Sequence, residues 1–262
     1  MRNRASVNIF RTDLSSHMTS YDLLKTFAII LMVIDHLGFF FFPHIEELRL
    51  IGRLSAPIWF FLIGYARTRK LELRLWIWGA VLLFGGMWIR QGHGFLPLNI
   101  LFDFLLIRAI LEVVMVRAVR NFETLFGMFW LFALLALPSI FFLEYGTFGV
   151  LFAMMGYLAR NRANIPTLSS KDIRIFILLA TLAYALGMWH EFHFETVNAG
   201  LMTVLLLCQS FLLFSFKPAD LPVKNPIARL LKYPLFLTGR RTLEIYVVHL
   251  LIFMYVKAYG VF

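Results

Sequence analysis

Residues 25–42 read KTFAIILMVIDHLGFFFF, an apolar run long enough to cross a lipid bilayer as a helix. Asp35 and His36 stand side by side in the second half of this run. An ionisable side chain in hydrocarbon costs about 2.5 to 3.5 kcal/mol, so it persists where it faces a partner or a cavity. The stretch therefore predicts a transmembrane helix with a functional position in its outer half.

The rest of the chain has the same apolar character. Of its 262 residues, 60% are hydrophobic and 17% are aromatic, including 29 Phe, which exceeds what the core of a soluble domain needs. At about 20 residues per crossing, the length leaves room for roughly eight to ten spans. We expect an all-α, polytopic transmembrane helix bundle with about nine spans, at 22–42, 51–66, 74–90, 96–116, 125–143, 146–160, 173–189, 196–216 and 242–260.

Charge patterning indicates how the bundle is oriented. Residues 1–21 are polar and basic, so we interpret them as a cytoplasmic tail and residues 22–262 as a single membrane-embedded domain. With the tail inside, most Lys and Arg fall on cytoplasmic segments, as the positive-inside rule requires. This bias accounts for the formal net charge of +10, so the bilayer and not nucleic acid is the expected partner. The Pro-containing segment 217–241 is expected to lie on the inner membrane surface, partly as helix.

Polar side chains inside the predicted spans mark a candidate site. They are Lys25, Asp35, His36, Arg53, Asn99, Asp103, Arg108, Glu112, Glu244, Tyr246 and His249. Lys25 and His36 are eleven residues apart, which places them within roughly 20° of one helix face, with His36 about 16 Å further out. Asn99 and Asp103 share a face of the antiparallel fourth span and are expected at the depth of His36.

Imidazole can take a proton from an attacking amine or hydroxyl, so His36 is a candidate general base. Structural roles stay open, because Asp35 could pair with Arg53 and His36 and His249 could simply hold the bundle together. Arg108 and Glu112 could likewise form an ion pair within one helix. The stretch WHEFHFE at 189–195 has metal-binding residue types, but no helix spacing fixes their geometry, and we expect no metal site. Cys208 is the single cysteine, so no intrachain disulfide can form.

Five blocks carry a resemblance to a known family. They are LKTFAIILMVIDHLGFFF (24–41), LRLIGRLSAPIWFFLIGYARTRK (48–70), NILFDFLLIRAIL (99–111), EYGTFGVLFAMMGYLARNR (144–162) and LTGRRTLEIYVVHLLIF (237–253). In this order they resemble the TraX family of bacterial inner-membrane proteins, known for N-terminal acetylation of conjugative pilin subunits. The last block is also similar to the final span of a larger membrane acyltransferase superfamily that acetylates surface sugars.

The resemblance implies an acetyltransferase of the bacterial inner membrane, with a cytoplasmic N-terminus, that uses acetyl-CoA and acts on a pilin-like protein. It implies His36 as the catalytic residue, because an early-span histidine has that role in the superfamily. We expect Asp35 or Asp103 to orient the imidazole and Lys25, Arg240 and Arg241 to bind the donor phosphates. The expected supporting residues are Arg53, Asn99, Asp103, Tyr246 and His249. An O-acetyltransferase of envelope sugars, a proton-coupled transporter and a structural partner of an envelope machine remain alternatives.

Overall fold

The computed structural model describes residues 18–91, 95–221, 233–235 and 237–260. The predicted cytoplasmic tail lies almost entirely outside these residues, as does most of the segment expected on the inner membrane surface. Of that segment, residues 233–235 and 237–240 are helical. The orientation of the chain in a membrane therefore stays a prediction.

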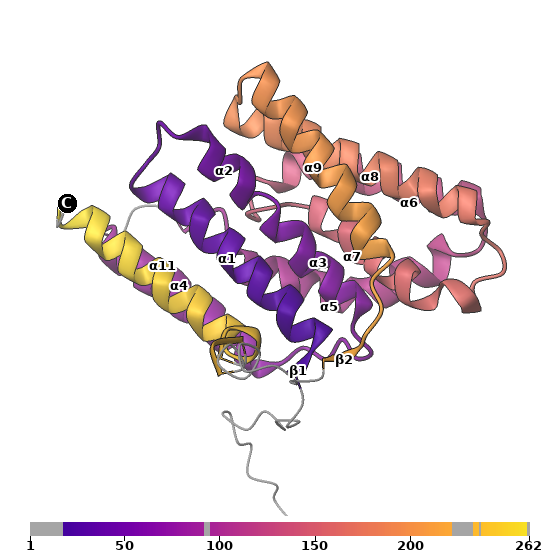
Figure 1. Cartoon of the computed structure of the whole chain (residues 1–262), viewed down its shortest axis with the longest axis horizontal. Helices are drawn as coiled ribbons and strands as arrows, with labels where there is room; N and C mark the ends of the chain where they lie inside the picture. The colour runs from indigo at the N-terminus through magenta and orange to yellow at the C-terminus, as the bar shows by residue number, and fades with distance from the viewer. Residues whose placement is uncertain (1–17, 92–94, 222–232, 236, 261–262) are drawn as a thin grey trace, which may run out of the picture.

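The described chain is all-α, as predicted, apart from one short strand pair (Figure 1). The elements are β1 (Met18–Thr19), α1 (Ser20–Phe40), α2 (Glu46–Gly52), α3 (Ser55–Tyr65), α4 (Leu73–Ile89), α5 (Ile100–Ala118), α6 (Phe122–Ser139), α7 (Phe148–Asn161), a 3-10 turn (Arg162–Asn164), α8 (Ser170–Phe192), α9 (Thr196–Phe214), β2 (Asp220–Leu221) and α11 (Thr242–Ala258). Each predicted span coincides with helix, although several boundaries differ by a few residues.

Among the described residues, five helical segments are long and apolar enough to cross a membrane: α1, the stretch of α2 and α3 taken together, α6, α8 and α9. Helix α4 is apolar but shorter. Helix α5 has sufficient length, but it carries Asp103, Arg108 and Glu112. The predicted count of about nine spans is therefore not confirmed, while the membrane character is supported.

The predicted second span, 51–66, corresponds to α3 and overlaps only the last two residues of α2, and the chain bends at Arg53 and Leu54 between these helices. The bend lies beside α1, where a Cβ placed on Gly52 would come within 2.2 Å of the Cβ of Asp35. Only glycine permits this approach, and it brings the end of α2 directly onto the acidic residue of α1.

Helix α1 lies at the centre of the arrangement in Figure 1, in contact with α2, α3 and α11. Helix α3 in turn packs along α7 at backbone contact distance. A Cβ on Gly64 would lie 1.8 Å from the carbonyl oxygen of Ala153, and one on Gly156 would lie 2.1 Å from that of Phe61. Close packing through small residues is how membrane helices associate, since lipid gives no hydrophobic drive between them.

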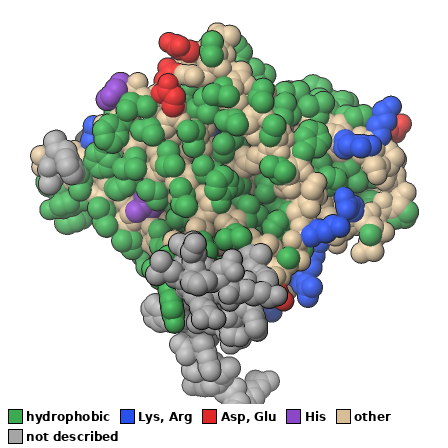
Figure 2. Space-filling view, viewed as in Figure 1, with side chains coloured by type: hydrophobic (Ala, Val, Ile, Leu, Met, Phe, Trp, Pro, Cys, Tyr) green, Lys and Arg blue, Asp and Glu red, His purple; other side chains and the backbone are tan. Residues whose placement is uncertain are grey.

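The molecular surface agrees with a lipid environment. Figure 2 shows apolar side chains over most of the visible face. Large hydrophobic residues are exposed along several helices, for example Phe84 at 65% and Trp88 at 74% on α4. Apolar exposure on this scale is unusual for a soluble monomer, so the chain is described below as a membrane protein.

Candidate active site

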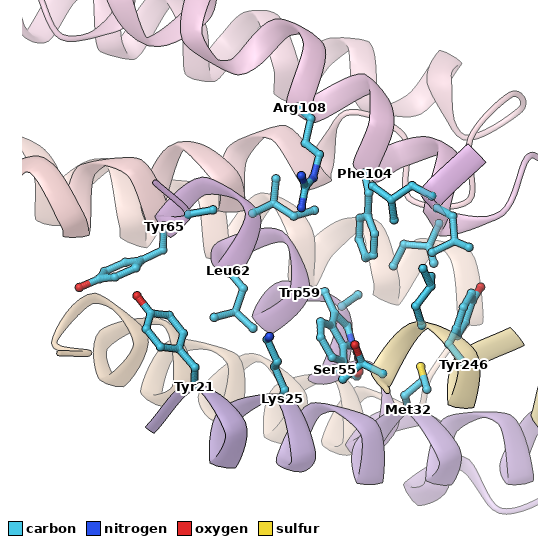
Figure 3. Close-up of a pocket in the computed structure, with 18 of the residues that line it drawn as sticks. Tyr21, Lys25, Met32, Ser55, Trp59, Leu62, Tyr65, Phe104, Arg108 and Tyr246 are labelled. Carbon is cyan, nitrogen blue, oxygen red and sulfur yellow. Dashed lines mark hydrogen bonds between the residues drawn. The ribbon is translucent and has the colours of Figure 1, made fainter. Parts of the chain in front are cut away.

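A cavity of about 1100 Å³ opens between α1, α3, α5 and α11 (Figure 3). Residues Tyr21, Lys25, Met32, Asp35 and His36 line it from α1. These positions follow a helical stripe, so the prediction that Lys25 and His36 share one face is confirmed. At about 1.5 Å of rise per residue, the cavity follows α1 for roughly 16 Å between these two side chains.

One end of the cavity is basic, although three of its arginines also pair with a carboxylate: Arg74 with Glu244, Arg108 with Glu72 and Arg240 with Asp22. Its lining cations are Lys25, Arg67, Arg74, Arg108, Arg160 and Arg240. Lys25 makes no hydrogen bond or ion pair within the described chain, so its ammonium is available to a ligand. The predicted donor contacts Lys25 and Arg240 both lie here, whereas Arg241 is absent from the lining and pairs with Glu244 at 3.1 Å.

The other arginines of this basic end were not among the predicted donor ligands. Arg108 lies in the inner half of the predicted fourth span, whereas Arg67 and Arg74 from one connection and Arg160 from another lie in segments predicted to face the cytoplasm. Their basic character was visible as positive-inside charge, but only the fold shows that they surround one cavity.

At the other end of the cavity, His36 forms a hydrogen bond with a second histidine. Its Nδ1 lies 2.7 Å from Nε2 of His249 on α11, and Nδ1 of His249 lies 2.7 Å from the carbonyl oxygen of Ile245. A carbonyl can only accept, so Nδ1 of His249 carries a proton and, in the neutral ring, Nε2 accepts from Nδ1–H of His36. Nε2 of a neutral His36 therefore keeps its lone pair, which a general base requires.

Asp35 does not orient His36, contrary to one of the predicted alternatives. Its Oδ1 lies 3.1 Å from Nε of Arg53 and 2.9 Å from Nη1 of Arg49, and its Oδ2 lies 2.5 Å from Nη2 of Arg53. The predicted pair of Asp35 and Arg53 is confirmed, and Arg49 is a partner that sequence reasoning missed. Because both carboxylate oxygens are engaged by guanidinium groups, Asp35 holds the end of α2 against α1.

The model of the family described as TraX protein matches residues 20–257. The chain belongs to the TraX family. It is also 25% identical to an uncharacterized protein of Rickettsia prowazekii (strain Madrid E) over 249 residues, which cover 94% of this chain and 96% of that protein. No solved structure matches the chain at a significant level.

The two Gly-Arg pairs of this TraX protein dock on α1 in the same way. Gly52 packs on Asp35, and the following Arg53 binds its carboxylate. At the basic end, a Cβ on Gly239 would lie 2.9 Å from Cα of Asp22, and Nε of Arg240 lies 3.8 Å from Oδ1 of Asp22. Each glycine removes the side chain that would separate the two backbones, so each arginine can reach an acid of α1.

Of the five predicted supporting residues of the TraX chain, Tyr246 alone lines the cavity. Arg53 and His249 bind the lining residues Asp35 and His36, whereas Asn99 and Asp103 bind neither of them. Asn99 caps α5, accepting from the amide of Leu101 at 3.2 Å and donating to the carbonyl of Gly79 at 3.1 Å. Asp103 is 1% exposed, and its carboxylate oxygens meet no hydrogen-bond partner in the described chain. Asp103 therefore does not orient His36 either. Asn99 and Asp103 were predicted to lie at the depth of His36, but depth in the membrane does not determine the direction in which a side chain points.

Arg108 and Glu112 do not form the ion pair within α5 that was one of the alternatives left open for them. Nη1 of Arg108 donates to the carbonyl of Lys70 at 2.8 Å and to Glu72 at 3.3 Å, while Glu112 pairs with Arg69. The segment after α3 runs beside this face of α5 and supplies both partners. The i, i+4 spacing correctly placed the two side chains on one face, but it did not identify their partners.

Three further side chains complete the end of the cavity near His36. Tyr246 was predicted, and its ring centroid lies 6.3 Å from that of His36. Glu144 and Tyr145 were not selected, because they belong to the connection before α7 and not to a helix. The hydroxyl of Tyr145 accepts from Nη1 of Arg53 at 3.2 Å, which ties this connection to the charged cluster around Asp35.

Proposed function

We propose that this TraX protein transfers an acetyl group from cytosolic acetyl-CoA to the N-terminal amine of a pilin-like protein at the outer side of the bacterial inner membrane. One observation carries the proposal. A single cavity joins a cation-lined end to His36, whose Nδ1 is bound by His249. The pilin acceptor is suggested by the association of the TraX family with pilin acetylation.

The cavity suits a donor with a polyanionic head and a long neutral arm. Phosphate groups would interact with Lys25, Arg240 and the other cations of the basic end. Beyond Lys25 the lining becomes mostly apolar, with Met32, Trp59 and Leu62 facing the space in Figure 3. An extended pantetheine arm would follow this stretch and bring the thioester to His36.

His36 would then act as the general base. Its Nε2 takes a proton as the acceptor nitrogen attacks the thioester carbonyl, a carbon–nitrogen bond forms and the carbon–sulfur bond breaks. The proton passes from His36 to the departing thiolate. His249 stabilises the imidazolium through its hydrogen bond, and the hydroxyl of Tyr246 would donate to the developing oxyanion.

The decisive variant is His36→Ala, assayed as detergent-solubilised protein for thiol release and for acetyl transfer to an N-terminal amine. We expect the rate to fall by about 10² or more, the usual contribution of a general base, while donor binding is retained. His44→Ala is the matched control, because His44 is exposed and lies outside the cavity. Full activity in folded His36→Ala protein would reject the assignment. A wild-type protein that binds but never consumes acetyl-CoA would reject the reaction itself.

A further inference from the structure

The basic end of the cavity also contains aromatic side chains that the proposed reaction has not yet used. Tyr21 and Tyr65 both line the cavity, and in Figure 3 they lie at the end beyond Lys25. Their ring centroids are 6.1 Å apart in an edge-to-face arrangement, and Phe216 packs edge-on against both rings at 5.3 and 5.5 Å. These contacts hold the two rings in place at the wall of the cavity, so little side-chain freedom is left to lose when a ligand binds.

Two guanidinium groups lie beside Tyr21. Its side chain interacts electrostatically with Arg160 and Arg67, and both arginines line the cavity. Nη1 of Arg160 donates to the backbone carbonyl of Tyr65 at 2.7 Å, and its guanidinium carbon lies 5.5 Å from the centroid of the Tyr65 ring. Because an arginine side chain has five N–H groups, this anchoring leaves donors of Arg160 for a ligand.

These two arginines differ in charge balance from the other arginines that line the cavity. Arg74, Arg108 and Arg240 each pair with a carboxylate. Within the described chain, neither Arg67 nor Arg160 forms an ion pair. Arginine stays protonated in proteins, so these two guanidinium groups keep a positive charge that an anionic ligand would neutralise.

The order of side chains along α1 matches the order of chemical groups in a CoA thioester. Tyr21 precedes Lys25 by four residues, about 6 Å of helix rise, and His36 lies eleven residues further on. A CoA thioester carries a nucleoside 3′-phosphate, a diphosphate, an uncharged pantetheine arm and the thioester, in that order. With the thioester at His36 and the diphosphate at Lys25, the nucleoside 3′-phosphate would therefore reach the level of Tyr21.

We propose that Tyr21, Arg67 and Arg160 bind the 3′-phosphoadenosine end of the donor, with the adenine base against the Tyr21 ring and the 3′-phosphate between the two guanidinium groups. The inference rests on the proposed acetyl transfer and adds the residues that select the donor. A phosphate monoester carries a charge of about −1.5 to −2 at pH 7, which two guanidinium groups would balance. Thioesters of free phosphopantetheine or of a carrier protein lack the nucleoside 3′-phosphate, so the site would discriminate against them.

Calorimetric binding to purified, detergent-solubilised protein tests this subsite without requiring turnover. The probes are CoA, dephospho-CoA, which lacks only the 3′-phosphate, and 4′-phosphopantetheine, which lacks the nucleotide. We expect CoA to bind wild-type protein at least about tenfold more tightly than dephospho-CoA, as charge-assisted hydrogen bonds permit. Equal affinities of CoA and dephospho-CoA for the wild-type protein would overturn the inference, whatever any variant does.

Variants separate the role of the charge from that of the ring. Arg67→Gln should lose most of the preference for CoA over dephospho-CoA, while the control Arg120→Gln, which replaces an exposed arginine outside the cavity lining, should keep it. Tyr21→Ala should weaken the binding of CoA and dephospho-CoA about tenfold, the usual effect of losing a stacked base, and leave phosphopantetheine binding unchanged. Tyr21→Phe keeps the ring and should retain the affinity for both nucleotides. An unchanged preference in folded Arg67→Gln, or unchanged nucleotide affinity in folded Tyr21→Ala, would reject the subsite.

Failure of the subsite and failure of the proposed reaction give different results. Binding that depends on the 3′-phosphate without any acetyl transfer from acetyl-CoA would reject the reaction and leave the subsite standing. Equal KM values for acetyl-CoA and acetyl-dephospho-CoA in an active enzyme would reject the subsite and leave the reaction standing.

Discussion

The hydrogen bond between His36 and His249 leads to the most specific prediction. If His249 holds His36 in the tautomer with a free Nε2, then His249→Leu should lower kcat for acetyl transfer and leave the KM for acetyl-CoA nearly unchanged. His249 is absent from the cavity lining, so we expect no loss of donor affinity.

The expected size of the loss in kcat follows from the hydrogen bond between the two histidines. His249→Leu leaves the Nδ1–H group of His36, a side chain that is 9% exposed, without its acceptor at 2.7 Å. An unsatisfied buried donor costs about 1 to 3 kcal/mol. Since about 1.36 kcal/mol corresponds to a factor of ten, we expect kcat to fall about 5- to 150-fold. His249→Gln offers an amide oxygen to the same N–H and should recover part of the rate.

The assay is initial-rate kinetics over a range of acetyl-CoA concentrations, with His44→Leu as the control for replacing an exposed histidine. A double-mutant cycle gives the strongest test. If His249 acts through His36, then His249→Leu should add no further loss to His36→Ala. Full kcat in His249→Leu, or a loss that simply multiplies in the double variant, would refute the positioning role.

Three other predictions follow from the same structure. Arg53→Ala should destabilise the protein by about 3 kcal/mol, because it leaves the Asp35 carboxylate with one guanidinium partner. Adding Asp35→Asn should restore part of the lost melting temperature, and a double variant that melts no higher than Arg53→Ala would contradict the pair. Lys25→Ala should raise the KM for acetyl-CoA about tenfold at unchanged kcat, and a rate loss that saturating donor does not restore would contradict a binding role. Reporters fused after residue 165 and after residue 193 should read cytoplasmic and external, respectively, and the reverse result would contradict the predicted orientation.

The sequence was informative wherever a property depended on one helix. The apolar runs predicted where helices form, and the eleven-residue spacing of Lys25 and His36 predicted their shared face, because helix geometry alone sets both. The pair of Asp35 and Arg53 could also be predicted, since a short connection leaves the two side chains within reach. Helix α2 was not predicted, because hydropathy does not show that a short separate helix precedes the bend at Arg53.

Membrane character, helix content and the position of His36 on a polar stripe were thus determined by local composition and period. Only the tertiary structure determined which residues these polar side chains contact. His36 meets His249 across 213 residues, and Arg53 meets Tyr145 across 92, because glycine contacts such as Gly64 on Ala153 set how the helices rotate and approach one another. Sequence spacing gives the direction of a side chain around its own helix, but the packing of all the helices determines what that direction faces.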